Sequence, residues 1–181
     1  MDVRVHCVLK GSRANGPGLR NVVWFQGCTL HCPGCFNPDT HDPKGGTLMP
    51  VPELTEELLS GMPEGITISG GEPFQQPAAL LELLDCLKER NAPPVLVFSG
   101  YPEAALREDR ERAACLRGID ALICGPYMKD SEPAYERFCS SENQQLVLLS
   151  NRLTAADFQN LPLTEVIIDP SGRAVISGIL Q

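Results

Sequence analysis

The sequence predicts an α/β protein, a partial and open (βα) barrel of five or six parallel strands followed by a C-terminal β-hairpin. Short β-branched runs alternate with helical segments, and this alternation is typical of a parallel sheet with helices packed outside it. A closed barrel of eight such units takes about 250 residues, whereas this chain has 181 residues. We therefore expect the barrel to stay open on one side, which leaves room for a macromolecule to present its reacting group.

Each strand and helix has a local signal in the sequence. Runs rich in β-branched and apolar residues predict strands at residues 3–9, 21–26, 65–69, 94–99, 119–124 and 145–150. Helices are predicted at residues 52–59, 77–90 and 102–116. The first of these helices carries Pro and acidic residues in its first turn, which favours a helix start.

The remaining segments are expected to form a loop and a hairpin. Residues 40–52 are rich in Pro and Gly, so a loop is predicted there. Residues 165–169 and 173–177 are expected to pair as an antiparallel hairpin around a turn at Pro170, Ser171 and Gly172. With 43% hydrophobic residues, the chain is predicted to fold as one domain over residues 1–181.

The composition restricts the possible partners and the location. A formal net charge of −8 at pH 7 argues against non-specific binding to nucleic acid or to an anionic membrane surface, because both need clustered Lys and Arg. Residues 1–30 lack a basic start followed by an apolar core, and no apolar run reaches the ~20 residues that span a bilayer. A cytoplasmic location is therefore expected.

Three of the eight cysteines, Cys28, Cys32 and Cys35, fall within one short segment directly after a strand-like run. Thiolates are soft ligands that suit zinc, copper(I) or iron–sulfur clusters. A structural zinc site or an electron-transfer cluster normally takes four protein ligands, so three cysteines leave a metal position open for chemistry. The alternative is a zinc knuckle completed by His31, His41 or a distant cysteine, although His31 adjoins Cys32 and joint ligation of one ion is awkward.

The other cysteines are dispersed along the chain. They are Cys7, Cys86, Cys115, Cys124 and Cys139. A disulfide framework is not expected in an acidic chain without a secretory signal. No second group of clustered cysteines follows the first, so one cluster and no auxiliary cluster domain are predicted.

The predicted strand at residues 65–69 runs directly into Gly70, Gly71, Glu72 and Pro73. Two glycines at the C-terminal end of a strand let a charged ligand approach the backbone closely, and free N–H and C=O groups in such a turn can bond an ammonium or a carboxylate. An ordinary βα connection is the alternative. Ser99 ends a neighbouring strand, where active groups collect, and is either a ribose or substrate contact or a turn-capping serine.

The chain resembles the radical S-adenosylmethionine enzymes, whose signature is this three-cysteine spacing. Among them it is similar to the activating enzymes of anaerobic ribonucleotide reductases. The matching segments are residues 15–20, 27–37, 69–73, 99–101, 120–127 and 140–144. They follow one another in order over most of the chain, which is more specific than the cysteine motif alone.

The resemblance implies the cofactors and the catalytic residues. Cys28, Cys32 and Cys35 would be the catalytic and metal-binding residues, holding three irons of a [4Fe-4S] cluster whose fourth iron chelates S-adenosyl-L-methionine. An electron from the reduced cluster would cleave that cofactor to methionine and a 5′-deoxyadenosyl radical, which abstracts hydrogen from the substrate. A flavodoxin- or ferredoxin-type protein would supply the electron.

The resemblance also implies which residues bind S-adenosylmethionine. The set comprises Gly34, Phe36, Gly70, Gly71, Glu72, Pro73 and Ser99. The glycine-rich turn would hold the amino group of the methionyl part. Phe36 would supply an apolar wall, since Gly34 stands where many radical enzymes have an aromatic residue, and the backbone at Gly34 and Phe36 would read the adenine edge.

The substrate implied by the resemblance is a backbone glycine in a partner enzyme, such as an anaerobic ribonucleotide reductase, which would become a glycyl radical. One alternative is a radical enzyme acting on a small molecule or a peptide, like the deazaguanine synthases. Those usually continue the third cysteine with Asp-Thr, whereas this chain has Phe36-Asn37, which favours the activating enzymes. Another alternative is a non-catalytic, metal-binding interaction module, which metal analysis and a test for S-adenosylmethionine cleavage would separate.

Overall fold

The computed structural model describes residues 1–168, 172 and 174–179. Its strands are β1 (Asp2–Ser12), β2 (Arg20–Phe25), β3 (Thr47–Pro50), β4 (Gly65–Gly70), β5 (Val95–Ser99), β6 (Ala121–Cys124), β7 (Gln145–Leu148), β8 (Thr164–Ile168) and β9 (Ala174–Gly178). Its α-helices are α1 (Val51–Leu59), α2 (Pro77–Glu89), α3 (Glu103–Glu108) and α4 (Arg110–Cys115). Short 3-10 helices span Pro38–Thr40, Pro73–Gln75, Leu116–Gly118, Tyr135–Arg137 and Ala155–Phe158.

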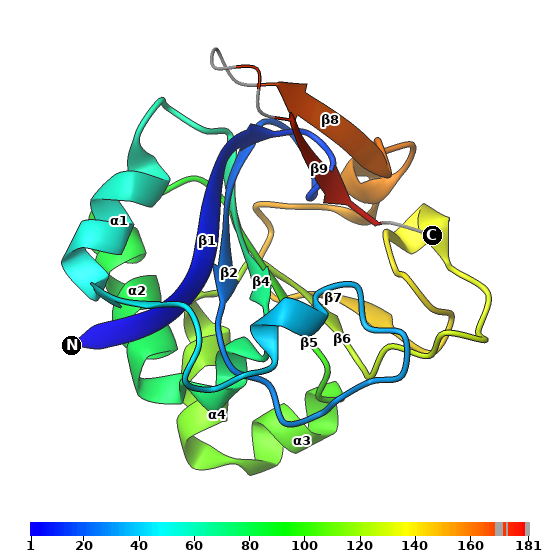
Figure 1. Cartoon of the computed structure of the whole chain (residues 1–181), viewed down its shortest axis with the longest axis horizontal. Helices are drawn as coiled ribbons and strands as arrows, with labels where there is room; N and C mark the ends of the chain where they lie inside the picture. The colour runs from blue at the N-terminus through cyan, green and yellow to red at the C-terminus, as the bar shows by residue number, and fades with distance from the viewer. Residues whose placement is uncertain (169–171, 173, 180–181) are drawn as a thin grey trace.

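A seven-stranded open sheet in the order β3-β1-β2-β4-β5-β6-β7 forms the centre of the molecule. Figure 1 shows the α-helices gathered on one side of this sheet and the β8–β9 hairpin on the other. Within the described residues no pairing joins β3 to β7, so the sheet is not closed, as its length predicted. The barrel curvature itself stays a prediction.

The number of parallel strands differs from the prediction of five or six. Only β2, β4, β5 and β6 run parallel, while β1 and β7 pair antiparallel with their neighbours. A parallel connection needs a crossover of a dozen or more residues, usually helical. The short loop between β1 and β2 and the helix-poor segment before β7 return the chain antiparallel instead.

Two further details of secondary structure were not predicted. Strand β3 lies in the segment expected to be a loop, and it exists because Val3 and Val5 of β1 pair with Met49 and Thr47. The helix expected at residues 102–116 is broken into α3 and α4. Asp109 causes this break, since its backbone is extended and its side chain caps α4.

The sheet has an apolar core on each face. Successive residues of a strand point to opposite faces, so Val95 and Val97 of β5 pack toward the helices while Leu96 packs on the other face. The core beneath the helices is the larger one. The second core includes Phe138 and Phe158 from the loops after β6 and β7.

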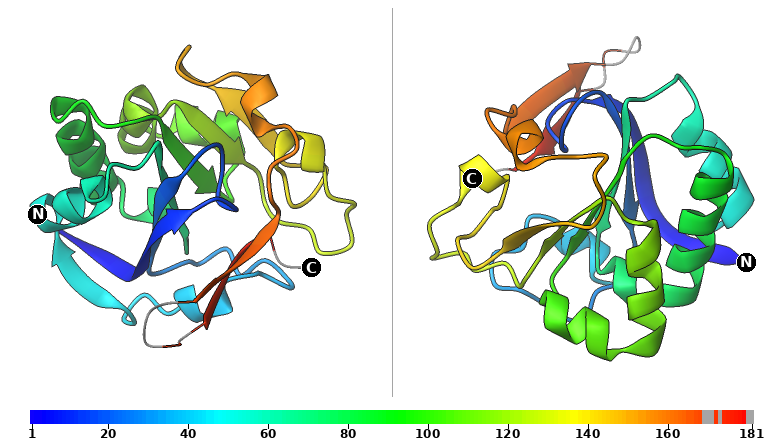
Figure 2. Two further views of the ribbon diagram at one scale, coloured as in Figure 1. Left: turned by 90° about the horizontal axis from the view of Figure 1, so that it is seen from above. Right: turned by 180° about the vertical axis from the view of Figure 1, so that it is seen from behind.

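The predicted C-terminal hairpin is present as the pair β8–β9. Residues 169–171 and 173, which include Pro170 and Ser171 of the predicted turn, lie outside the described residues. Two views in Figure 2 show the hairpin on the side of the sheet away from α1 and α2. Glu165 anchors it, accepting hydrogen bonds from the Ser12 hydroxyl and the Arg13 N–H. Among the helices of the described chain, none has the length and apolar character needed to cross a bilayer.

Candidate active site

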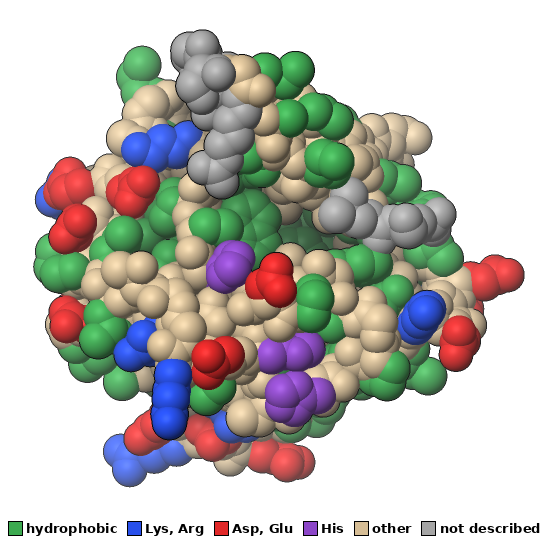
Figure 3. All heavy atoms as spheres, viewed as in Figure 1, with side chains coloured by type: hydrophobic (Ala, Val, Ile, Leu, Met, Phe, Trp, Pro, Cys, Tyr) green, Lys and Arg blue, Asp and Glu red, His purple; other side chains and the backbone are tan. Residues whose placement is uncertain are grey.

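A cavity of about 460 Å³ lies at the C-terminal ends of the parallel strands. Of the ten residues predicted for the site, eight line it: Cys28, Cys32, Cys35, Phe36, Gly70, Gly71, Glu72 and Ser99. The hairpin forms a further wall through Val175 to Gly178. Figure 3 shows this face hollowed, with hydrophobic side chains inside the hollow and histidines beside it. The structure thus brings three separate motifs to one cavity.

Gly34 and Pro73 are the two predicted site residues that are not among the described lining residues. Gly34 is exposed, with a φ of +72°, and a Cβ atom there would meet the aliphatic part of the Lys129 side chain. Pro73 is buried at the start of the 3-10 helix Pro73–Gln75, where its fixed φ suits a first helical position. Their roles in cofactor binding stay predictions.

The cysteine loop is held in place by backbone hydrogen bonds. Gly27, with a φ of +102°, turns the chain away from β2. Its N–H donates to the Thr40 carbonyl at 2.7 Å, and the Cys28 N–H donates to the His41 carbonyl at 3.1 Å. The loop therefore leaves β2 and returns beside its own start, and its sulfurs are presented from one short segment.

The three thiols of this loop differ in exposure, and two of them bind their protons more tightly than an ordinary cysteine does. Cys28 is buried, whereas Cys32 and Cys35 are half-buried, and all three are free of disulfides. Burial raises the pKa of Cys28 and of Cys35. Backbone N–H groups act in the opposite direction, as when Asn37 donates to the Cys35 sulfur at 3.4 Å. The unliganded loop therefore favours neutral thiols, and metal binding has to displace protons.

The chemistry of the donor set fits an iron–sulfur cluster, since three thiols lie on one loop and backbone N–H groups are directed at the sulfurs of Cys28 and Cys35. Across the part of the chain that the structure describes, no three His, Cys, Asp or Glu side chains converge closely enough to hold one ion. His31 and His41, the candidates for completing a zinc knuckle, face each other with their Nδ1 atoms 3.3 Å apart. A four-iron cluster spreads its thiolate ligands over a larger object, and the N–H groups directed at sulfur are typical of cluster loops.

The glycine-rich turn after β4 approaches protein backbone closely. A Cβ atom on Gly70 would overlap the backbone of Phe25, and one on Gly71 would overlap the Gly27 carbonyl. The Gly71 N–H donates to the Phe25 carbonyl at 2.8 Å, and the Glu72 N–H donates to the Gly27 carbonyl at 3.0 Å. These two N–H groups are therefore not free for a ligand, and binding of the methionyl amino group by the turn stays a prediction. They join the turn to the start of the cysteine loop.

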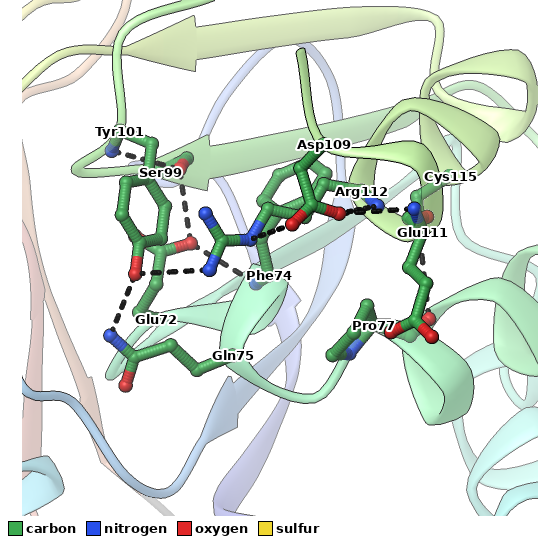
Figure 4. Close-up of polar contacts among 10 residues, drawn as sticks. All are labelled: Glu72, Phe74, Gln75, Pro77, Ser99, Tyr101, Asp109, Glu111, Arg112 and Cys115. Atoms are coloured by element: carbon green, nitrogen blue, oxygen red, sulfur yellow. Dashed lines mark hydrogen bonds and ion pairs between the residues drawn. The ribbon is translucent and has the colours of Figure 1, made fainter. Parts of the chain in front are cut away.

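Glu72 is fully buried and joins the turns after β4 and β5. One carboxylate oxygen accepts hydrogen bonds from the Phe74 N–H at 3.1 Å and the Ser99 hydroxyl at 3.0 Å, and the other accepts from the Gly100 N–H at 2.7 Å. Figure 4 shows this carboxylate between the two turns. Burial raises the pKa of Glu72 to about 7, although these donors oppose the rise. Ser99 also accepts from the Tyr101 N–H, which is the turn-capping geometry.

Two lining residues, Tyr127 and Ser177, were not among those predicted for the site. The ring of Tyr127 packs against the ring of Phe36 with centroids 4.6 Å apart, so the apolar wall has two aromatic members. Ser177 of the hairpin lines the cavity and accepts a hydrogen bond from the Asn15 amide at 2.7 Å. Both lie far from the cysteine loop in sequence. Tyr127 ends the matching segment 120–127, which was the available signal, whereas Ser177 lies outside every matching segment and only long-range contacts reveal it.

Cys124 and Cys139 belong to the packed interior. Both side chains are buried, and burial raises the pKa of each thiol to about 11. A thiol with so high a pKa is a poor nucleophile and a poor metal ligand. They pack as small apolar residues.

Comparison with known proteins identifies relatives of this chain. A family described as a 4Fe-4S single cluster domain matches residues 14–147. The pyruvate formate-lyase-activating enzyme of Clostridium pasteurianum is 38% identical over 104 residues, which cover 54% of this chain and 44% of that protein. The anaerobic ribonucleoside-triphosphate reductase-activating protein of Enterobacteria phage T4 is 31% identical over 138 residues, covering 73% of this chain and 85% of the phage protein.

The relatives differ in how much of their length this chain spans. A putative glycyl-radical enzyme activating enzyme of Haemophilus influenzae is 31% identical over 105 residues, which cover 56% of this chain and 40% of that protein. The chain thus spans less than half of the two bacterial relatives and most of the phage protein. The residues matched by the family, 14–147, include the cysteine loop and strands β2, β4, β5 and β6.

Proposed function

This chain belongs to the 4Fe-4S single cluster family, and because it is also similar to proteins named as activating enzymes, we propose that it generates a glycyl radical on a partner enzyme. The observation that carries the proposal is the meeting of the three-cysteine loop and the Gly70-Gly71 turn at one open cavity. Its cofactors are a [4Fe-4S] cluster and S-adenosylmethionine. When bound, they supply reductive carbon–sulfur cleavage and hydrogen abstraction.

Cys28, Cys32 and Cys35 would hold the cluster as thiolates. The protein contributes three cysteines on one loop, the N–H groups directed at sulfur, and the burial of Cys28 away from water. Three protein ligands leave one iron for S-adenosylmethionine, which supports a catalytic rather than a purely electron-transferring cluster.

Phe36 and Tyr127 would supply the apolar wall for the adenosyl part of S-adenosylmethionine. The glycine-rich turn would face the methionyl part with its remaining backbone groups, since the N–H groups of Gly71 and Glu72 are already bonded to β2 and Gly27. Glu72 and Ser99 would stabilise the shape of that turn, since the Ser99 hydroxyl donates to the Glu72 carboxylate.

The open sheet supports a macromolecular substrate. A cavity walled by the cysteine loop and a C-terminal hairpin admits an extended peptide segment carrying a glycine. An anaerobic ribonucleotide reductase is the simplest partner, because the phage T4 relative is named for that activity and this chain spans 85% of its length. A flavodoxin- or ferredoxin-type protein would reduce the cluster. Residues 1–181 would form one domain with a single cluster.

The test is electron paramagnetic resonance of the anaerobically reconstituted, reduced protein mixed with S-adenosylmethionine and a candidate partner. We expect the doublet of a glycyl radical, formation of 5′-deoxyadenosine, and about four irons per chain. If deuterium instead passes into 5′-deoxyadenosine from a small metabolite, and no glycyl radical enzyme of the same cell gives a doublet, glycyl radical generation is rejected and the small-molecule reaction is favoured.

A further inference from the structure

Gln75 contacts the cysteine loop directly, although it belongs to a different motif. It ends the 3-10 helix Pro73–Gln75 that follows the glycine-rich turn. Its side-chain oxygen accepts from the Thr29 N–H at 3.1 Å, and its side-chain nitrogen donates to the Thr29 hydroxyl at 2.8 Å. One amide therefore holds both the backbone and the side chain of the residue that follows Cys28.

The Gln75 amide also has a partner in the turn after β5. Its nitrogen also donates to the Tyr101 hydroxyl at 3.1 Å (Figure 4). Arg112 lies over the Tyr101 ring, with its guanidinium carbon 4.2 Å from the ring centroid, and donates to the same hydroxyl at 3.5 Å. The Thr29 N–H can only donate, so it requires the Gln75 oxygen on its side, whereas the two hydroxyls can donate or accept.

The contact joins three segments at one point. Thr29 comes from the cysteine loop, Gln75 from the turn after β4, and Tyr101 from the turn after β5. Cys28 lines the cavity, whereas Thr29 and Gln75 are not among its described lining residues, so the amide acts from outside the cavity. Thr29 is exposed in part, and backbone hydrogen bonds alone do not fix its side chain.

We propose that Gln75 is a positioning residue that fixes the orientation of Cys28, and so of the cluster, relative to the Gly70-Gly71 turn. This inference rests on the proposed function. Loss of the amide would leave the three thiolates present but would loosen the Cys28 ligand. A displacement of about 1 Å between reacting groups can lower a rate by about 100-fold, and altered hydrogen bonding around a cluster shifts its potential.

The neighbouring Gln76 offers a matched control. It has the same side chain, but it accepts from the Arg4 N–H at 2.8 Å and donates to the carbonyls of Arg4 and Gln26. These contacts hold β1 against the end of β2 and do not involve the cysteine loop. Gln75→Ala and Gln76→Ala therefore separate positioning of the cluster from general packing.

The experiment compares the full-length wild type, Gln75→Ala, Gln75→Glu and Gln76→Ala after anaerobic reconstitution. Iron content, the electron paramagnetic resonance spectrum of the dithionite-reduced cluster with and without S-adenosylmethionine, and the rate of cofactor cleavage are measured. We expect Gln75→Ala to keep about four irons, to change the reduced-cluster spectrum, and to lower the turnover rate by about 10- to 100-fold. Gln75→Glu keeps an acceptor for Thr29 and should restore the spectrum and most of the rate.

Gln76→Ala should reduce thermal stability without changing the spectrum. A wild-type spectrum and rate in Gln75→Ala, or equal spectral changes in Gln75→Ala and Gln76→Ala, would overturn the positioning role. Failure of the wild type itself to bind a cluster or to cleave S-adenosylmethionine would overturn the proposed function instead. The two failures are therefore distinguishable.

Discussion

Glu72 and Arg20 are buried charged residues at opposite ends of the parallel strands, and both tie neighbouring strands together. Glu72, after β4, accepts hydrogen bonds from the turns after β4 and β5. Arg20, at the start of β2, donates to the carbonyls of Ile66 and Pro94 at the starts of β4 and β5. Each is fully buried and bonded mainly to backbone.

The two residues differ in their charge at neutral pH. Burial lowers the pKa of Arg20 to about 10 and raises the pKa of Glu72 to about 7. Desolvation opposes the charged form in both, but the two groups start from very different reference values. The N-terminal end of the strands thus keeps a constant charge, while the end that carries the cavity holds a carboxyl group that titrates near neutral pH.

The largest effect is expected from Cys28→Ala, which acts at the cavity end. Removing a cluster ligand should reduce bound iron well below the wild-type value and S-adenosylmethionine cleavage to background. Iron and sulfide analysis and product chromatography measure these quantities. Cys124→Ala is the control and should retain both, because its thiol is buried away from the cavity. Full iron in Cys28→Ala with loss in Cys124→Ala would reverse the assignment.

Arg20→Leu acts at the other end and should mainly affect stability. It removes the guanidinium donor from the carbonyls of Pro17, Ile66 and Pro94, of which Pro94 still accepts from the Ile66 N–H at 3.0 Å. The free energy of unfolding should fall by about 3 kcal/mol or more, since buried acceptors lose their hydrogen bonds. Denaturant unfolding measures the loss.

An exposed residue, Arg117, provides the control for this prediction. Arg117→Leu should change the free energy of unfolding by less than about 0.5 kcal/mol. Cleavage activity per folded molecule should be unchanged in Arg20→Leu. A stable but inactive Arg20→Leu would contradict the view that Arg20 serves stability while the cavity end of the strands serves activity.

The pH dependence of stability should distinguish the two buried charges directly. The folded pKa of Glu72 is raised from 4.5 to about 7, so the folded state holds a proton that the unfolded state loses between these values. This contribution is complete below pH 4.5 and is lost as pH rises through about 7. It corresponds to up to about 3 kcal/mol.

Glu72→Gln cannot titrate, so the difference in unfolding free energy between wild type and this variant isolates the effect. Denaturant unfolding at a series of pH values between about 5 and 8 measures it. As pH rises, the unfolding free energy of the wild type should fall relative to that of Glu72→Gln. A flat difference would show that the Glu72 carboxyl does not titrate near neutral pH.

The smallest effect is expected from Ser99→Ala, which removes one donor to Glu72. It should cost about 1 kcal/mol and raise the pKa of Glu72 further, because a hydrogen bond to the charged form is lost. Ser150→Ala removes a donor to Asp120 near the other end of the strands. It should cost a similar amount without moving the neutral-range transition, and a shift of equal size in both variants would contradict this.

The sequence identified the local parts of the site because their signals are local. Three closely spaced cysteines form one loop in any fold that exposes it, and Gly70-Gly71 directly after a strand form a turn at the sheet edge. Eight of the ten predicted site residues line the cavity for this reason. Gly34 is exposed and is not among the described lining residues, and its φ of +72° is a backbone feature that periodicity does not reveal.

The sequence alone thus predicted the positions of most strands and helices and the motifs of the site, since these depend on short-range propensity. Tertiary structure decided the directions of β1 and β7, the pairing that creates β3, and the partners of the Gly71 and Glu72 N–H groups. It also brought Gln75 to Thr29 and raised the pKa of Glu72. These outcomes depend on which distant segments exclude water from one another, and such contacts have no local signature in the sequence.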